Sequence, residues 1–271
     1  MATKPTPVTD VVEVKSTPVS TVSTSRLAML AEQAKQAAAV ERPSISKVSL
    51  KSGVISYGGN PVKDNKLDCI ILAATYRNTF YPGRYDPNNI VNPTCFSLAE
   101  TDEGMVPDSV VADPINPTCD GCPHREWGSD LNGGRGKACK ETRRLVLLPA
   151  TVLDDADPIK AIREGELAIL DLPVTSVKNY SQYVNILAAS IGLPIWACVT
   201  EVSAKPDAKT QFKVLFTGIR AAANTDALID ALEARRADAI RIGLIGYDST
   251  TSEEEAEAAA NTPPKKANKK F

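Results

Sequence analysis

Residues 67–76 read Leu-Asp-Cys-Ile-Ile-Leu-Ala-Ala-Thr-Tyr, a run in which apolar side chains dominate. An apolar run of this length without glycine or proline predicts a long β-strand. Two shorter runs precede it, at residues 48–50 and 54–57, and they lead to the turn sequence Gly-Gly-Asn-Pro at 58–61. We therefore predict strands on both sides of this turn.

The second half of the chain also contains runs typical of strands. Phe212, Val214 and Phe216 alternate with polar side chains, as in a half-buried strand. Strands are predicted at residues 144–148, 167–172, 195–202 and 211–217, and a helix at 226–236 leads to a short apolar stretch at 240–245.

One helix interrupts the predicted strands, because apolar side chains recur there with the spacing of a single helix face. Thr175 or Ser176 is the expected cap, and Gly192 with Pro194 is the expected end. The apolar face consists of Tyr180, Tyr183, Val184, Leu187, Ala188 and Ile191.

These elements predict a mainly β fold with a few helices. About five antiparallel strands, a helix midway and a long inserted loop are the outline of a small closed barrel, most economically a five-stranded OB-fold. A β-sandwich is the competing interpretation. In either case we expect a flexible amino-terminal arm at residues 1–45 with a short alanine-rich helix, one domain at 46–248 with an insertion at about 86–143, and a disordered charged tail at 249–271.

The overall composition limits the classes of function. Hydrophobic residues make up 43% of the 271 residues, which is ample for a core, and the formal net charge is −2. Any nucleic-acid surface would therefore be a local basic patch. We expect no signal peptide and no membrane span, because no apolar stretch has the required length.

Four of the six cysteines fall in the insertion: Cys95, Cys119, Cys122 and Cys139. The middle pair forms a C-x2-C turn that lets two thiolates hold one ion, and the outlying pair can complete the tetrahedron that zinc prefers. The insertion is too poor in apolar residues to form its own core, so metal binding would supply folding energy. We predict one structural Zn²⁺ per chain.

Two alternatives to zinc are disulfides and unliganded thiols. Disulfides need an oxidising compartment, which nothing in the sequence indicates. Cys69 and Cys198 lie in apolar runs and are typical of small core residues. Because four thiolates already satisfy the ion, we expect His124 to lie beside the site or at the surface.

The sequence does not support catalysis. A site with four cysteine ligands is closed to water. His124-Arg125-Glu126 resembles the H-x-E of zinc deaminases, but here it follows the cysteine pair. A phosphate-loop match at Gly136-Lys137 also fails, because Ala138 replaces the required Ser or Thr. We therefore predict that the protein is not an enzyme.

Aromatic and basic residues gather at two places, residues 76–96 and residues 125–144. Aromatic rings stack on bases whatever their sequence, and arginine adds phosphate contacts and cation–π stacking. The alternative is that some of the rings pack beneath their loop and that the charges are only a solvated face. The candidate nucleic-acid contacts are Tyr76, Arg77, Phe80, Tyr81, Arg84, Tyr85, Arg125, Trp127, Arg135, Lys137, Lys140, Arg143 and Arg144.

Several motifs resemble those of the zinc-containing single-stranded DNA-binding proteins of tailed bacteriophages. The likeness covers roughly residues 46–218, and its most specific part is Gly134-Arg135-Gly136-Lys137-Ala138-Cys139-Lys140 with the cysteine turn before it. The other matching stretches are Asn65-Lys66-Leu67-Asp68, the run from Tyr81 to Pro87, Cys119-x-x-Cys122-Pro123, Trp127-Gly128-Ser129 and the run from Pro173 to Lys178.

The resemblance implies an OB-fold and sequence-independent binding to single-stranded DNA. It also implies a role in phage DNA replication or recombination, in the cytoplasm of the infected bacterial host. Such proteins often recruit replication or recombination partners through an acidic tail with a terminal aromatic residue. Phe271 is terminal here, but four lysines separate it from the glutamates. A zinc-containing phage structural or transcription-associated interaction protein is the alternative.

Overall fold

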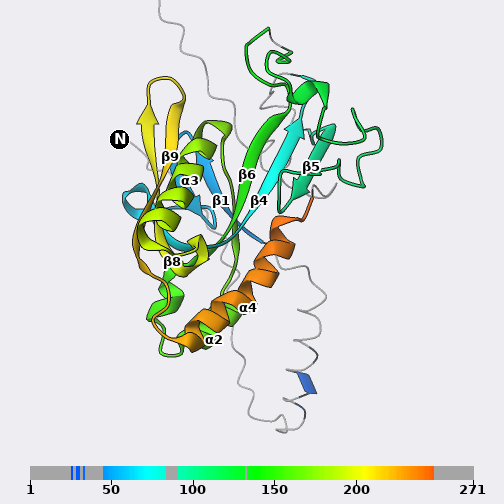
Figure 1. Ribbon diagram of the computed structural model, residues 1–271. Helices are drawn as coiled ribbons and strands as arrows, with labels where there is room; N and C mark the ends of the chain where they lie inside the picture. The colour runs from blue at the N-terminus through cyan, green and yellow to red at the C-terminus, as the bar shows by residue number, and fades with distance from the viewer. Residues whose placement is uncertain are drawn as a thin grey trace, which may run out of the picture. The chain divides into compact units, whose positions relative to one another are not determined.

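The computed structural model describes residues 26, 29–30, 33, 45–83, 91–131 and 133–246 (Figure 1). The chain divides into two units, Met1–Ser44 and Ile45–Phe271. In the first unit, the described residues Arg26, Met29, Leu30 and Gln33 are helical, and they lie within the predicted alanine-rich helix. The remaining description concerns the second unit.

One mixed sheet of nine strands forms the centre of the described domain. Along the sheet the order is β3-β2-β1-β7-β6-β4-β8-β9, and β5 pairs with the second half of β4. All pairs are antiparallel except β1 with β7. The strands are β1 (Ser46–Lys51), β2 (Val54–Tyr57), β3 (Asn60–Pro61), β4 (Lys66–Phe80), β5 (Cys95–Ala99), β6 (Lys140–Pro149), β7 (Ala168–Asp171), β8 (Cys198–Asp207) and β9 (Gln211–Ala221).

The nine strands confirm the prediction of a mainly β fold. The sheet is larger than the predicted set of about five antiparallel strands, contains one parallel pair and curls into a half-barrel. A β-bulge interrupts the pairing of β4 with β6 between Ile71 and Ala73. The Asn65 side chain then joins two parts of the sheet that are not neighbours in strand order. Its amide donates to the carbonyls of Gly53 at 2.8 Å and Ala204 at 2.9 Å, and its oxygen accepts from the Ile55 N–H at 2.7 Å. The β1–β2 hairpin is thereby tied to β8.

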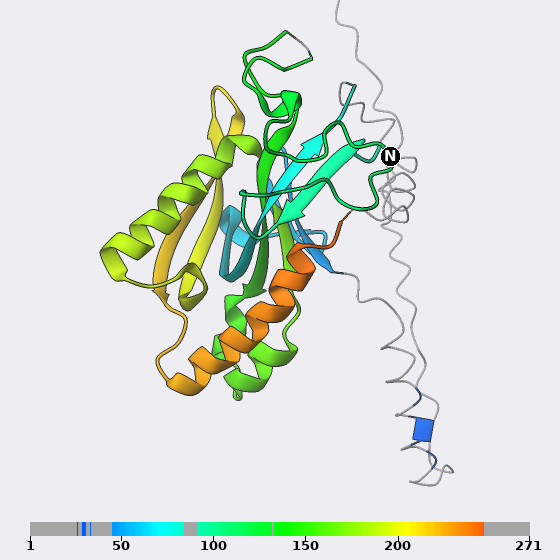
Figure 2. The same cartoon turned by 45° about the vertical axis from the view of Figure 1, so that its right-hand side comes forward.

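Within the described domain, three helices cover the sheet: α2 (Pro158–Glu164), α3 (Val174–Ile186) and α4 (Asp226–Gly243). The α4 face of the sheet carries Ile70, Val146 and Leu148, on which α4 and α2 pack (Figure 2). The opposite face, called here the α3 face, carries Ile71, Leu145 and Leu147 and packs against Tyr180 of α3. Neighbouring residues of β6 alternate between these two cores, as a strand requires, and those of β4 do so except at the bulge, where Leu72 and Ala73 both belong to the α4-face core.

The structure corrects three details of the predicted elements. Ser176 does not cap α3, because its hydroxyl accepts the Val214 N–H at 2.9 Å; Pro173 occupies the cap position. Residues Ile195–Ala197 form a 3₁₀ turn before β8. The apolar stretch predicted at 240–245 largely continues α4, because Ile240 and Ile242 pack on the α4-face core. No helix among the described residues is both long and apolar enough to cross a membrane.

Candidate metal centre and nucleic-acid interface

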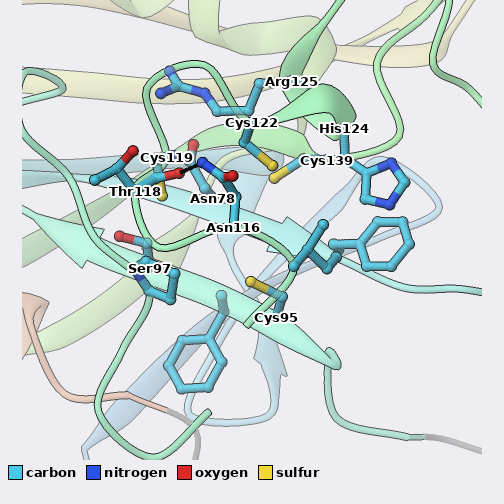
Figure 3. Close-up of a pocket in the computed structure, with 14 residues that line it drawn as sticks. Asn78, Cys95, Ser97, Asn116, Thr118, Cys119, Cys122, His124, Arg125 and Cys139 are labelled. Atoms are coloured by element: carbon cyan, nitrogen blue, oxygen red, sulfur yellow. Dashed lines mark hydrogen bonds between the residues drawn. The ribbon is translucent and has the colours of Figure 1, made fainter. Parts of the chain in front are cut away.

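The four cysteines of the insertion line one pocket, together with Phe80 and His124 (Figure 3). Cys95 begins β5, and Cys139 directly precedes β6. Both strands pair with the end of β4, so the sheet itself brings these two cysteines together. None of the six cysteines of the chain forms a disulfide.

The Cys119–Cys122 pair is shaped by its backbone. The Cys122 N–H donates to the Cys119 carbonyl at 3.3 Å, and Gly121 adopts φ +73°, where a side chain would be strained. The Cys139 N–H donates to the His124 carbonyl at 2.8 Å. The main chain thus connects the segment after the turn to Cys139.

The thiols lie close enough to influence one another. Burial raises the pKa of Cys139 to about 12, and the neighbouring thiols Cys119, Cys122 and Cys95 add to that effect. Burial likewise raises the pKa of Cys95. Thiolates crowded in this way need a cation for compensation, which is the chemistry of a thiolate metal site.

The structure does not show a metal site as such. In the described part of the chain, no group of three or more histidine, cysteine, aspartate or glutamate side chains is arranged to hold a metal ion. It shows four cysteines gathered around one pocket, with the sulfur atoms of Cys122 and Cys139 turned toward each other (Figure 3).

Phe80 and His124 form one wall of this pocket. Their rings stack with centroids 4.3 Å apart and an angle of 8° between the planes. Phe80 is only 7% exposed and packs with Ala138 and Cys139. This corrects the prediction of Phe80 as a nucleic-acid contact. The ring belongs to a small core beneath the insertion, because Phe80 is the last residue of β4 and lies beside the cysteines.

Arg125 is surrounded by carboxylates. Its guanidinium pairs with Glu141 at 2.8 Å, Asp102 at 3.0 Å and Asp120 at 3.4 Å. Burial alone would lower the pKa of Arg125, but the hydrogen bond to Glu141 and the nearby negative charges outweigh it and raise the pKa. The guanidinium predicted to meet a phosphate is therefore already engaged within the protein.

Arg77 and Arg144 share the carboxylate of Asp171 on the α4 face. Arg144 lies 2.8 Å from one oxygen of Asp171 and Arg77 lies 3.3 Å from the other. Arg144 is only 7% exposed, and its Nη1 donates to the Ile245 carbonyl just beyond α4. This burial corrects the prediction of Arg144 as a nucleic-acid contact. Arg77 pairs with the same carboxylate.

Trp127 lies on a loop at residues 126–138, here called the Trp127 loop, which is closed by its own backbone. The Gly128 and Asp130 N–H groups both donate to the Gly136 carbonyl, at 3.0 and 3.1 Å. The Trp127 side chain is nevertheless 78% exposed. The Lys137 ammonium lies 5.4 Å from the centre of its ring, and Arg135 and Lys140 are exposed nearby in sequence.

Three further candidate contacts, Tyr76, Tyr81 and Arg143, lie on or beside the second half of β4. The Arg143 guanidinium stacks over the Tyr76 ring at 3.4 Å, on the α3 face. Tyr81 is 37% exposed where β4 ends. Arg84 and Tyr85 lie outside the described residues.

Sequence reasoning missed the carboxylates Asp102, Asp120, Glu141 and Asp171. No local signal marks them, because their pairings depend on how distant strands and loops come together. Comparison of the chain with protein-family models, with curated proteins and with solved structures found no match.

Proposed function

We propose that the protein binds single-stranded DNA, largely without regard to sequence and without catalysis. The observation that carries this proposal is Trp127, whose ring is 78% exposed beside the Lys137 ammonium. A large ring held in water on a structured loop, flanked by cations, is a platform on which a base can stack. Lys137 itself pairs with Glu141, so in a chain of net charge −2 the exposed Arg135 and Lys140 would form the local patch for phosphates.

The fold supports the proposal at a coarser level. A curled mixed sheet with a helix on its α3 face is consistent with an OB-type barrel, in which the insertion between β4 and β6 would be the binding loop. The Arg143–Tyr76 stack would extend the strand's path from the Trp127 loop onto the sheet.

The proposed metal is one structural Zn²⁺ per chain, held by Cys95, Cys119, Cys122 and Cys139. The observation that supports it is the gathering of all four thiols around one pocket, at the base of the Trp127 loop. The ion would supply folding energy to an insertion with little core. The chain's own residues fix the loop's shape through the backbone bonds described above.

The proposed setting is phage DNA replication or recombination, in the cytoplasm of the infected bacterial host, with partner proteins recruited through the carboxyl-terminal tail. These parts rest on the motifs that resemble the phage family.

The test uses tryptophan fluorescence. Trp127 and Trp196 are the only tryptophans of the chain, so Trp196→Phe leaves Trp127 as the sole tryptophan, which is excited at wavelengths that tyrosine does not absorb. Oligo-dT and mixed-sequence single strands should quench this fluorescence equally at low salt, and a duplex of the same sequence should quench it far less. Absence of quenching and of any mobility shift at low salt would refute the proposal.

A second candidate is a docking protein of the virion or the transcription apparatus. The observation that favours it is apolar exposure in the same insertion: Val110 is 66% exposed and Leu131 is 54% exposed. A docking surface has no need of cations around a stacking ring, so the two candidates separate in the experiment above.

A further inference from the structure

We infer that Arg125 is a positioning residue that assembles the four-cysteine pocket, and not a contact for the DNA strand. The functional meaning of this inference rests on the metal centre proposed above, but the ion pairs around Arg125 form without any metal. Three carboxylates, those of Asp102, Asp120 and Glu141, surround the one guanidinium. Together these four residues are called the Arg125 clamp.

Each carboxylate of the clamp belongs to a segment that carries a cysteine of the pocket. Asp102 follows β5, which begins at Cys95. Asp120 lies between Cys119 and Cys122, and Glu141 comes two residues after Cys139. One side chain therefore joins all three segments on which the four thiols depend.

The geometry uses the full fork of the guanidinium. Nε donates to Glu141 at 2.8 Å, Nη2 donates to both oxygens of Asp102 at 3.0 and 3.2 Å, and Nη1 donates to Asp120 at 3.4 Å. Lysine offers a single ammonium on a flexible stem and cannot reach three partners in fixed directions. The other oxygen of Asp120 accepts the Gly104 N–H at 3.2 Å, which extends the clamp into the loop after β5.

The guanidinium at the centre of the clamp is largely shielded from water, whereas the Asp102 and Asp120 side chains are 50% and 58% exposed. The Arg125 side chain is 13% exposed, and both oxygens of Glu141 also accept from the Lys137 ammonium at 3.0 Å. The Arg125–Glu141 pair, whose side chains are 13% and 29% exposed, is therefore screened less by salt than the pairs with Asp102 and Asp120. The Arg125 backbone N–H also donates to the Cys122 carbonyl at 2.9 Å, so main chain and side chain hold the same turn.

Two consequences follow for binding. If the clamp orders the three segments before the metal binds, binding no longer carries the entropic cost of ordering them. The clamp should therefore raise metal affinity. Since its charge is already satisfied, Arg125 should neutralise no phosphate. A residue that only stabilised the fold would not affect metal affinity selectively.

The experiment measures zinc affinity of the full chain by competition with a chromophoric chelator. Arg125→Ala should lower the affinity at least tenfold and Arg125→Lys should recover only part of it, while the Co²⁺-loaded variants keep the wild-type thiolate absorption. Arg163→Ala, on the exposed side of α2, is the control and should change nothing. Zinc affinity of Arg125→Ala within twofold of wild type would overturn the inference.

A second measurement decides the inference if the wild-type chain binds no zinc, an outcome that would refute only the proposed metal centre. Hydrogen exchange of the metal-free chain over residues 101–126 should be faster in Arg125→Ala than in Arg163→Ala. Equal exchange would overturn the clamp. If Arg125→Ala does not fold, Asp102→Asn and Asp120→Asn replace it in both measurements with the same expected direction.

Discussion

Arg144 of β6 and Asp171 of β7 form an ion pair at 2.8 Å on the α4 face. The register of the two strands places these residues directly opposite each other. The same guanidinium donates to the Ile245 carbonyl at the end of α4, where the helix dipole favours a positive charge. This pair therefore links the sheet to the last helix of the domain.

Replacing Arg144 with Ala should destabilise the domain by about 3 kcal/mol, at the lower end of the range for breaking a buried pair because Asp171 retains Arg77. Urea denaturation measures the change. Arg135→Ala is the matched control, since Arg135 is exposed, and its midpoint should stay at the wild-type value. Equal midpoints for the two variants would contradict the structural role of Arg144.

The stability of the domain should fall in acid partly through Asp171. Burial acts to raise the pKa of this carboxyl, but Arg77 and Arg144 outweigh it and hold the pKa below its usual value. A group with a depressed folded pKa stabilises the fold above its unfolded pKa of about 3.9, and this contribution is lost as pH falls through the folded pKa. Melting temperatures should therefore drop below about pH 4, and Asp171→Asn should show a smaller drop from a lower plateau. Parallel curves for the two proteins would argue against this linkage.

Most of the secondary structure could be predicted from the sequence, for a physical reason. Most side chains of the run from Leu67 to Tyr76 pack into one or the other of the two cores, so its apolar character reflects its place in the sheet. Strand β5 (Cys95–Ala99) and helix α2 (Pro158–Glu164) were missed, because five and seven residues are too few to show a periodicity.

The candidate site was predictable only in part. Spacing indicated the four cysteines, because a C-x2-C turn is a local feature, and the structure brings them to one pocket. The fates of Phe80, Arg125 and Arg144 depend on long-range register and on carboxylates distant in sequence. Charge and aromaticity alone could not separate these residues from the exposed Trp127 and Arg135.

Trp127 and Phe80 should behave oppositely on truncation. Trp127→Ala should weaken single-strand affinity by about 1–3 kcal/mol if the ring stacks on a base, and leave the unfolding midpoint unchanged. Phe80→Ala should destabilise the protein by about 3–5 kcal/mol, because it empties part of a packed wall beside His124. Fluorescence anisotropy and thermal denaturation of both variants measure the two quantities. A Trp127 variant that loses stability but keeps its affinity would place that ring in the core as well.

Removal of metal should loosen the insertion without abolishing any reaction. Protein made in zinc-replete medium should contain about one zinc per chain by elemental analysis, and a strong chelator should lower its melting temperature. Cys119→Ser should show the same lower melting temperature without chelator. A thiol reductant should have no effect, which separates the metal from a disulfide. Metal-free protein from such medium would exclude the proposed centre.

The salt dependence of binding should locate the strand's path among the exposed cations. For single strands, the logarithm of affinity falls with the logarithm of salt concentration by about 0.7 per phosphate neutralised. Replacing both Arg135 and Lys140 with Ala should therefore reduce the magnitude of the slope by about 1.4, for oligo-dT and mixed sequences alike. Lys160 and Arg163, which are exposed on α2, provide a control pair that removes the same charge elsewhere and should leave the slope unchanged. Equal losses for the two pairs would show that binding follows the net charge of the chain and not a path along the Trp127 loop. Uneven losses across oligonucleotides would instead indicate contacts with base edges, which differ from one sequence to the next.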